Sequence, residues 1–208
     1  TLEMARSWSQ NRLATMLRDS PILQNRVADV KSRDSGNTVL NKSFDGGHIA
    51  TCGANSPASL ASRPIKIVLC DEVDRYPPSA GTEGDPISLA KRRSATFWDR
   101  KIVLTSTPTI AGASRIESAF ENTDKRKFLV PCPKCNHAQE LKWSQIVWEN
   151  KDSDTARYLC KKCDCKWTES ERIKSISKGK WVATSEGNGS NIGFHLSGLY
   201  SVWMTMEE

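Results

Sequence analysis

Residues 65–72 read IKIVLCDE, a nearly unbroken apolar run that ends in two adjacent carboxylates, Asp71 and Glu72. An apolar run of this length is typical of a β-strand that is covered on both faces in a parallel sheet. Cys70, at the end of the run, is interpreted as a small buried hydrophobic residue. The stretch therefore predicts a core strand that delivers acidic side chains to one edge of a sheet.

A second apolar run, KIVLTST at residues 101–107, is also of strand length and ends in hydroxyl side chains. Between the two runs, residues 86–97 read PISLAKRRSATF, and Asp85 followed by Pro86 has the pattern of a helix N-cap and first turn. The order strand, basic surface helix, strand predicts a βαβ unit with parallel strands. The expected fold class is therefore α/β.

The acidic strand end fits the chemistry of ATP hydrolysis. An ATPase needs one carboxylate to hold Mg²⁺ and another to orient and deprotonate the attacking water, and Asp71 and Glu72 match this Walker B pattern. Hydroxyl groups at the end of the neighbouring strand would lie beside the pair, where they can sense the γ-phosphate or the water. These hydroxyls belong to Thr105, Ser106 and Thr107. An acidic strand end next to an ordinary strand-to-turn exit remains the alternative interpretation.

The phosphate-binding loop of such an ATPase, G-x-x-x-x-G-K-[ST], does not occur in the 208 residues. The nearest stretches, Asp45–Gly47 and Gly81–Gly84, lack the Lys and the Ser or Thr that the loop requires. The sequence thus predicts a partial P-loop NTPase sheet of the RecA-like (ASCE) type. The chain also begins without Met inside an expected helix, so it is interpreted as an interior fragment that is nearly inactive alone.

Four of the seven cysteines form two C-x-x-C pairs that are separated by 24 residues. This spacing predicts a zinc ribbon, in which four thiolates hold a structural Zn²⁺ and leave no open position for catalysis. The metal would stabilise a module that is too small to build its own core. Cys165 and His137 lie close by but are expected not to be ligands. The predicted ligands are Cys132, Cys135, Cys160 and Cys163.

The net charge of the chain favours a polyanionic partner but does not prove one. The chain has 30 Lys and Arg residues against 24 Asp and Glu residues, for a formal net charge of +6. This balance favours a polyanion such as DNA, although a basic solvated surface would give the same count. Trp143 and Trp167 are expected to pack over the ribbon strands, while direct DNA contact by the ribbon stays open. No apolar run is long enough for a membrane span, and the first ten residues lack a signal-peptide pattern.

Local patterns predict three further elements. Residues 1–29 are expected to form two short helices, with Ser20 as the N-cap of the second. Residues 37–56 alternate apolar and polar side chains around Asp45, Gly46 and Gly47, which predicts a hairpin with a glycine turn. The stretch ESERIKSISKG, residues 169–179, is expected to be a helix.

Several longer motifs, taken in order, resemble one protein family. DEVDRYP (71–77), TSTPTIAGASRIESAF (105–120) and VPCPKC (130–135) are similar to the large terminase subunit of tailed bacteriophages, in the GpA-like group with a zinc ribbon after its ATPase core. GANSPASLASRP, GDPISLAKRR and IGFHLSGLYSVW resemble the same family. The resemblance covers about residues 1–203.

The resemblance implies an ATP-driven motor that packs double-stranded DNA into a procapsid, with an endonuclease in the same protein. It gives Asp71 the Mg²⁺ role and Glu72 the role of catalytic base, with Thr105, Ser106 and Thr107 as the coupling motif. Arg115 and Arg63 become candidates for contacts with the nucleotide or a neighbouring subunit. It also implies a homo-oligomer, the small terminase subunit and the portal as partners, ATP as a cofactor, and the cytoplasm of the bacterial host as location.

The predicted division is a partial ATPase core at residues 1–127, a zinc ribbon at 128–168 and a connector at 169–208. Two other functions stay open. A superfamily 2 helicase would use residues 71–74 as its D-E-x-D box, but it requires a second RecA-like domain where the ribbon begins. A non-enzymatic zinc-ribbon protein that binds DNA or acts as a scaffold would explain the cysteines and the charge. It would leave the acidic strand end unexplained.

Overall fold

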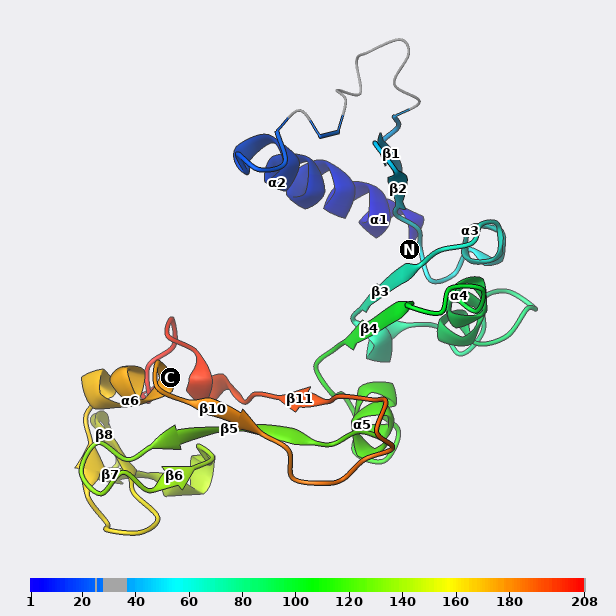
Figure 1. Cartoon of the computed structure of the whole chain (residues 1–208). Coiled ribbons are helices and arrows are strands. Elements are labelled where there is room, and N and C mark those ends of the chain that lie inside the picture. Colours follow the sequence, from blue (N-terminus) through cyan, green and yellow to red (C-terminus); the bar gives the residue numbers. More distant parts are fainter. Residues whose placement is uncertain (25, 28–36, 208) are drawn as a thin grey trace. The chain divides into compact units, whose positions relative to one another are not determined.

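The computed structural model describes residues 1–24, 26–27 and 37–207, and its contacts divide the chain into two compact units (Figure 1). The N-terminal unit comprises residues 1–110 and 114–116, and the C-terminal unit comprises residues 111–113 and 117–208. Each unit has its own sheets and its own buried apolar cluster. No helix in the described parts of the chain is long and apolar enough to cross a membrane.

The N-terminal unit begins with one continuous helical stretch. It consists of α1 (Leu2–Trp8), the π-helical turn η1 (Ser9–Leu13) and α2 (Ala14–Asp19). Its buried residues are Ala5, Ser9 and Leu13, whose spacing of four places them on one face of the helix. The helix ends at Ser20, which has an extended backbone because the following proline disfavours helical geometry in the residue before it.

The predicted second helix with Ser20 as its N-cap is therefore wrong at its start, because Ser20 is the C-cap of α2. Residues 21–24 form a turn in which the amides of Leu23 and Gln24 donate to the carbonyl of Ser20. Residues 25, 28 and 29 of that prediction lie outside the described residues.

The predicted hairpin is confirmed. Its strands are β1 (Asn41–Phe44) and β2 (Gly47–Ala50), which pair in antiparallel register from Asn41↔Ala50 to Phe44↔Gly47. Asp45 and Gly46 form the turn, and Gly46 has φ +83°, a conformation that favours glycine.

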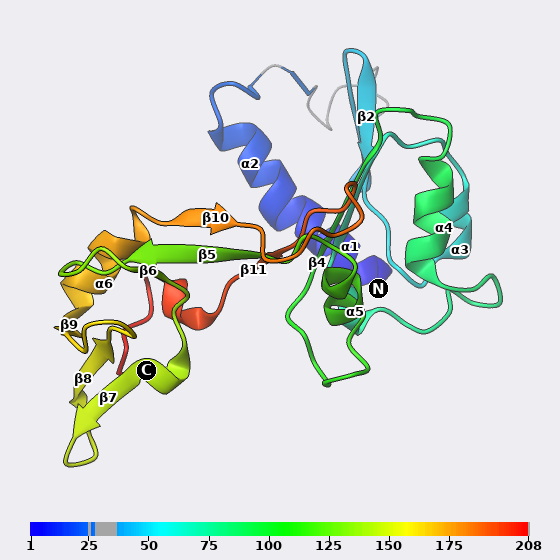
Figure 2. The ribbon, with the colours of Figure 1, turned by 60° about the horizontal axis from the view of Figure 1, so that its bottom comes forward.

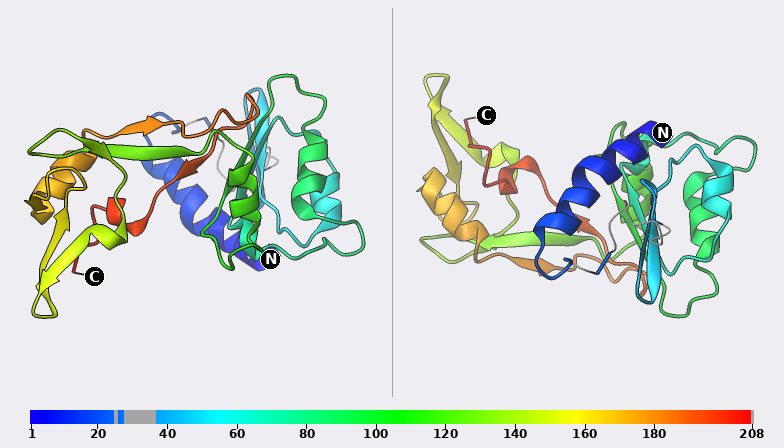
Figure 3. Two further views of the ribbon diagram at one scale, coloured as in Figure 1. Left: turned by 90° about the horizontal axis from the view of Figure 1, so that it is seen from below. Right: turned by 90° about the horizontal axis from the view of Figure 1, so that it is seen from above.

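The predicted βαβ unit is also confirmed. Strands β3 (Ile67–Asp71) and β4 (Lys101–Thr105) are parallel neighbours, paired from Ile67↔Lys101 to Asp71↔Thr105. Helix α4 (Pro86–Arg93) lies between them in the sequence, and the Asp85 carboxylate caps it by accepting a hydrogen bond of 2.8 Å from the Ser88 amide. Helix α3 (Pro57–Ala61) packs beside α4 (Figure 3). The N-terminal unit thus has a mixed α/β fold with a small parallel sheet.

One face of this sheet is packed and the other is not. On the packed face, Cys70 is buried in a cluster with Val73 and Ile87, which confirms its prediction as a buried residue. On the opposite face, Ile67, Leu69 and Val103 are 51%, 74% and 45% exposed. The prediction of a strand covered on both faces is wrong for this chain, because α4 and the turn after β3 cover only one side.

The C-terminal unit contains two small sheets (Figure 2). In the first, β5 (Arg126–Pro131) lies between β10 (Lys180–Val182) and β11 (Phe194–His195), and β6 (Ala138–Gln139) pairs with the end of β5. The second has the order β7 (Ile146–Glu149), β8 (Asp152–Leu159), β9 (Lys166–Trp167). The C-terminal unit also contains α6 (Glu169–Ile176) and the short turns η3 (Trp143–Gln145) and η4 (Gly198–Tyr200). Helix α5 (Arg115–Glu121) begins in the N-terminal unit, which also contains the short turn η2 (Val73–Arg75).

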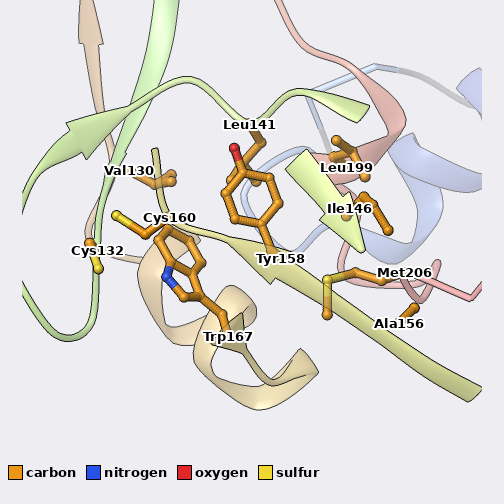
Figure 4. Packing of buried hydrophobic residues seen from close by; sticks show 10 residues of the cluster. All are labelled: Val130, Cys132, Leu141, Ile146, Ala156, Tyr158, Cys160, Trp167, Leu199 and Met206. Carbon is orange, nitrogen blue, oxygen red and sulfur yellow. The ribbon is translucent and has the colours of Figure 1, made fainter. Parts of the chain in front are cut away.

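The core of the C-terminal unit gathers around the cysteines (Figure 4). Tyr158 and Trp167 are fully buried, and their ring centroids are 4.9 Å apart. The prediction that Trp167 packs over the ribbon strands is confirmed. The same prediction for Trp143 is wrong, because this side chain is 59% exposed. The other members of the cluster are Val130, Cys132, Leu141, Ile146, Ala156, Cys160, Leu199 and Met206.

Within residues 169–208, predicted as a connector, helix α6 and the segment around Tyr200 pack against the rest of the C-terminal unit. Helix α6 begins with a capping box formed by Thr168 and Glu171. Its Arg172 is 1% exposed and pairs with Glu169. The Arg172 guanidinium also donates to three carbonyls of the C-terminal segment, those of Leu199, Ser201 and Met204.

Tyr200 attaches the same segment to the first sheet. Its hydroxyl donates to the Phe128 carbonyl at 2.7 Å and accepts from the Leu141 amide at 2.8 Å. Burial raises the pKa of Tyr200 to about 12, so this hydroxyl stays protonated and able to donate at neutral pH. The helix predicted at 169–179 is confirmed over Glu169–Ile176.

Candidate functional site

The carboxyl ends of β3 and β4 bring Asp71 and Thr105 together. The two residues are direct partners in the parallel register, and the Thr105 hydroxyl donates to Asp71 Oδ1 at 2.7 Å. Both are exposed, and the alternation along the strands places them on the unpacked face with Leu69 and Val103. Carboxylate and hydroxyl oxygens are the ligand types that Mg²⁺ prefers, so this pair is chemically suited to that ion.

Glu72 follows the last residue of β3 and starts the turn after it. Its backbone is in the left-handed region, with φ 56° and ψ 47°, and it is followed by the turn η2. A non-glycine residue in this region costs roughly 1–3 kcal/mol and persists only where its surroundings hold it. Here Val73, which is fully buried, anchors the turn directly after Glu72. The Glu72 carboxylate is 3.4 Å from the Arg75 Nε in an exposed ion pair.

The other two hydroxyl residues differ in their surroundings. The Ser106 Oγ accepts from the Asp74 amide at 3.2 Å, so the end of β4 is bonded to the turn after β3. Thr107 is exposed, and its carbonyl accepts from the Ser106 hydroxyl at 3.2 Å. The structure therefore brings Asp71, Thr105 and Ser106 to one edge. Within the described residues, the bond found for Thr107 uses its carbonyl and not its side chain.

Asp74 is a site residue that sequence reasoning assigned only to the helicase alternative. Its Oδ2 accepts from the amide and hydroxyl of Thr109 at 3.0 and 3.2 Å, and its Oδ1 accepts from the Ile116 amide at 2.8 Å. Partial burial raises the pKa of Asp74, but hydrogen bonds from Ser114, Ile116 and Thr109 outweigh it and hold the pKa below its usual value. Asp74 thus fastens the loop after β4 and the start of α5 to the turn that carries Glu72.

The two predicted arginines have different positions. Arg115 donates to the Pro77 carbonyl at 2.9 Å and lies 3.5 Å from the Asp85 carboxylate, so it joins the turn after β3 to the N-terminus of α4. Arg63 precedes β3, and its guanidinium lies 3.5 Å from the Asn41 side chain. The structure does not bring Arg63 to the edge that holds Asp71. Roles for Arg115 and Arg63 toward a nucleotide or a neighbouring subunit stay predictions.

The four predicted zinc ligands form a compact thiol cluster in the C-terminal unit. The Sγ atoms of Cys132, Cys135, Cys160 and Cys163 all lie within 4.8 Å of one another. The pairs Cys132–Cys163 and Cys135–Cys160 are each 3.8 Å apart. Four sulfurs in a tetrahedron around Zn²⁺, at Zn–S of about 2.3 Å, are about 3.8 Å apart. Both the donor set and its spacing therefore fit Zn²⁺.

The two C-x-x-C knuckles repeat the same backbone design. Asn136 and Asp164, one residue after each pair, are left-handed with φ 57° and 54°. Amides of each loop point at the first cysteine: Lys134 and Lys162 donate to Cys132 and Cys160 Sγ, both at 3.4 Å. Burial raises the pKa of Cys132, but the amides outweigh it and lower the pKa to about 6, which favours the thiolate that a metal requires.

Cys165 and His137 occupy equivalent positions in the two knuckles. The carbonyl of His137 accepts from the Cys132 amide at 2.9 Å, and that of Cys165 accepts from the Cys160 amide at 3.0 Å. Cys165 Sγ is 3.4 Å from Cys132 Sγ and from Cys163 Sγ, yet the group of four mutually close ligand atoms does not include it. That neither Cys165 nor His137 belongs to the ligand set stays a prediction.

Known proteins similar to this chain come from bacteriophages. The family described as "Phage terminase large subunit gpA, ATPase domain" matches residues 1–181. The terminase large subunit of Enterobacteria phage P21 is 28% identical over 192 residues, which is 88% of this chain and 29% of that protein. The terminase large subunit of Escherichia phage lambda is 26% identical over 170 residues, 77% of this chain and 26% of that protein. The chain thus spans less than a third of these relatives, and no solved structure matches it.

Proposed function

This chain belongs to the phage terminase large subunit gpA ATPase domain family, and from that premise we propose that it supplies the acidic and coupling edge of an ATP-driven DNA-packaging motor. In this proposal the N-terminal unit is part of a RecA-like P-loop NTPase sheet. The phosphates of ATP are held by a loop that the 208 residues do not contain. The C-terminal unit is a zinc ribbon that follows the ATPase core.

The observation that carries the proposal is the bond between Asp71 and Thr105 across two parallel strands. It supports one edge at which a metal-binding carboxylate and a hydroxyl act on the same nucleotide. The left-handed turn at Glu72 supports a second carboxylate, directly after the strand end. ATP hydrolysis requires two acidic groups, because one binds the metal and the other activates the water.

The proposed roles follow from these positions. Asp71 would hold Mg²⁺, which neutralises phosphate charge when it is bound. Glu72 would orient the attacking water and accept its proton. Thr105, Ser106 and Thr107 would couple hydrolysis to movement, with Ser106 linked to the Asp74 amide. Because Asp74 also bonds the start of α5, movement at the edge would reach that helix.

Further parts of the proposal concern the whole large subunit. It would translocate double-stranded DNA into a procapsid, act as a homo-oligomer with the small terminase subunit and the portal, and carry an endonuclease outside these residues. It would act in the cytoplasm of the bacterial host. The matched family and the two relatives are terminase large subunits, which favours the packaging motor over the helicase and scaffold alternatives.

The test is ATP turnover by a large subunit that contains these residues together with a phosphate-binding loop. Glu72→Gln should lower turnover by about 10²–10⁴-fold, the usual contribution of a general base, while ATP binding persists. Glu83→Gln is the matched control, because Glu83 is an exposed glutamate of the same unit. Unchanged turnover in Glu72→Gln would disprove the assigned role. The isolated chain should hydrolyse ATP at a rate near background.

A further inference from the structure

A loop of residues 94–100 joins α4 to β4 (Figure 1), and it carries an exposed tryptophan. Trp98 is 95% exposed, the highest value among the large hydrophobic side chains of the described residues. Water around an indole is unfavourable, and an exposed aromatic with charged neighbours is typical of a binding surface. The surroundings of Trp98 therefore indicate what it could bind.

Those surroundings are strongly basic. Residues 91–101 read KRRSATFWDRK and contain five basic residues against one acidic residue, Asp99. Asp99 is already paired with Lys66, at 2.5 Å. The ion pairs found within the described residues use none of the five cations of this stretch. These cations are Lys91, Arg92, Arg93, Arg100 and Lys101.

Backbone hydrogen bonds bring the basic residues to one edge of the sheet. The Ile65 amide donates to the Arg93 carbonyl at 3.0 Å, and the Lys101 amide donates to the Lys66 carbonyl at 3.1 Å. Arg100 donates to the Ala95 carbonyl at 3.3 Å. The end of α4 and the starts of β3 and β4 therefore meet at the amino end of the strands, the edge opposite to Asp71.

The loop is held in place from beneath. Ser94 is fully buried, and its hydroxyl donates to the Lys91 carbonyl at 2.8 Å. The Phe97 amide donates to the Ser94 carbonyl at 3.1 Å, so Trp98 projects from a bonded turn. Cations in the last turn of a helix also complement its dipole, which accounts for Lys91 to Arg93. Helix stability does not account for Trp98 or for the cations at the start of β4.

We propose that this surface, composed of Lys91, Arg92, Trp98, Arg100 and Lys101, contacts double-stranded DNA. The cations would bind backbone phosphates without reading sequence, and Trp98 would pack against sugars and base edges in a groove. The proposal rests on the proposed motor function for the choice of duplex DNA. The surface lies at the sheet edge away from the carboxylates, so DNA and nucleotide would bind to different edges.

The experiment is a titration of a fluorescently labelled duplex with the 208-residue chain, read by anisotropy at several salt concentrations. Trp98→Ala should weaken binding by about fivefold or more, the usual loss when an aromatic side chain at the centre of an interface is truncated. Arg92→Ala combined with Arg100→Ala should reduce the slope of log affinity against log salt by about two, because two phosphate contacts are lost. Arg92→Lys combined with Arg100→Lys should keep that slope.

The controls use the other unit. Trp203→Ala removes a side chain that is 90% exposed, and Lys174→Ala combined with Lys178→Ala removes two exposed charges. Both should leave affinity and slope unchanged. Equal losses in the test and control variants, no duplex binding at low salt, or a preference for single-stranded over duplex DNA would overturn the proposal.

The outcome is independent of the ATPase test. Normal DNA binding with turnover unaffected by Glu72→Gln would reject the motor assignment and keep the DNA surface. The opposite outcome would reject only the DNA surface. In that case Glu72→Gln loses turnover as predicted, while Trp98→Ala and the double arginine-to-alanine variant bind DNA as the unchanged chain does.

Discussion

The two units of this chain reach stability in different ways. In the C-terminal unit, the buried cluster has ten members, two of which are the cysteines Cys132 and Cys160, and Tyr158, Trp167 and Val130 are fully buried. In the N-terminal unit, the cluster at the parallel sheet has only three buried members, Cys70, Val73 and Ile87. One face of that sheet leaves Leu69 74% exposed.

The two units also differ in where they place their polar and apolar side chains. The C-terminal unit packs its apolar residues around four thiols whose spacing fits a structural Zn²⁺. The sheet of the N-terminal unit has the bonded carboxylate and hydroxyl of Asp71 and Thr105 on the face that is not packed. Apolar surface on such a face is typical of a surface that another segment or molecule covers. Three predictions follow from the comparison.

The largest expected effect is the loss of the metal from the ribbon. Metal analysis of the purified chain should give about one zinc per chain. Cys160→Ser or strong chelation should unfold the C-terminal unit, because structural zinc contributes about 10–16 kcal/mol in comparable small modules. The N-terminal unit should keep its structure. Hydrogen exchange followed by mass spectrometry would report the two units separately.

Cys52→Ser is the matched control for the zinc experiment, since Cys52 is an exposed cysteine of the N-terminal unit. Cys165→Ser should also retain zinc, because Cys165 lies outside the group of four ligand atoms. A metal-free chain in which β7, β8 and β9 stay protected from exchange would contradict the assignment.

A smaller effect should distinguish the two kinds of packing. Trp167→Ala removes a fully buried ring and should lower the free energy of unfolding by about 3–5 kcal/mol. Leu69→Ala, on the exposed sheet face, should change it by no more than about 0.5 kcal/mol. Urea unfolding with probes in each unit measures both. A comparable loss for Leu69→Ala would mean that this face is covered in solution.

The smallest effect concerns Asp74 and depends on pH. Asp74→Asn should destabilise the N-terminal unit by about 1–3 kcal/mol at neutral pH, because the carboxylate accepts bonds from the loop after β4 and from α5. The pKa of Asp74 is lowered in the folded chain, so its stabilisation is complete above the ordinary Asp pKa of about 3.9. It is lost as the pH falls below that value toward the folded pKa.

The difference between wild type and Asp74→Asn should therefore shrink at acid pH. Unfolding midpoints between neutral and acid pH would measure it. Asp45→Asn, at the exposed turn of the β1–β2 hairpin, is the control and should show no such difference. A deficit of Asp74→Asn that is constant across the pH range would contradict the role of the carboxylate charge.

Patterns that depend on neighbouring residues were predictable from sequence. The apolar runs at 65–70 and 101–107 predicted two parallel strands, Asp85 predicted the cap of α4, and the glycine turn predicted the hairpin. Ser20 misled the prediction because a serine before proline fits both the start of a helix and its end. Only the conformation of Ser20 in the folded chain distinguishes the two.

Features that depend on distant partners were not predictable. Asp74 bonds residues 35 and 42 positions away, and these contacts exist only once β3 and β4 are paired. Arg172 is charged and lies on a polar helix, yet it is buried because carbonyls about 30 residues later converge on its guanidinium. Trp143 and Trp167 are alike in local sequence signal, and only packing makes one exposed and the other buried.

The sequence alone determined the acidic strand end, the hydroxyl strand end and the spacing of the four cysteines, because strand chemistry and knuckle spacing are local. The tertiary structure decided which of these groups meet. Parallel register joined Asp71 to Thr105, and Glu72 took a left-handed backbone at the turn after β3. The folded loop after α4 left Trp98 exposed next to a basic stretch of the chain. Such relations are three-dimensional, since they follow from pairing and burial between segments far apart in the chain.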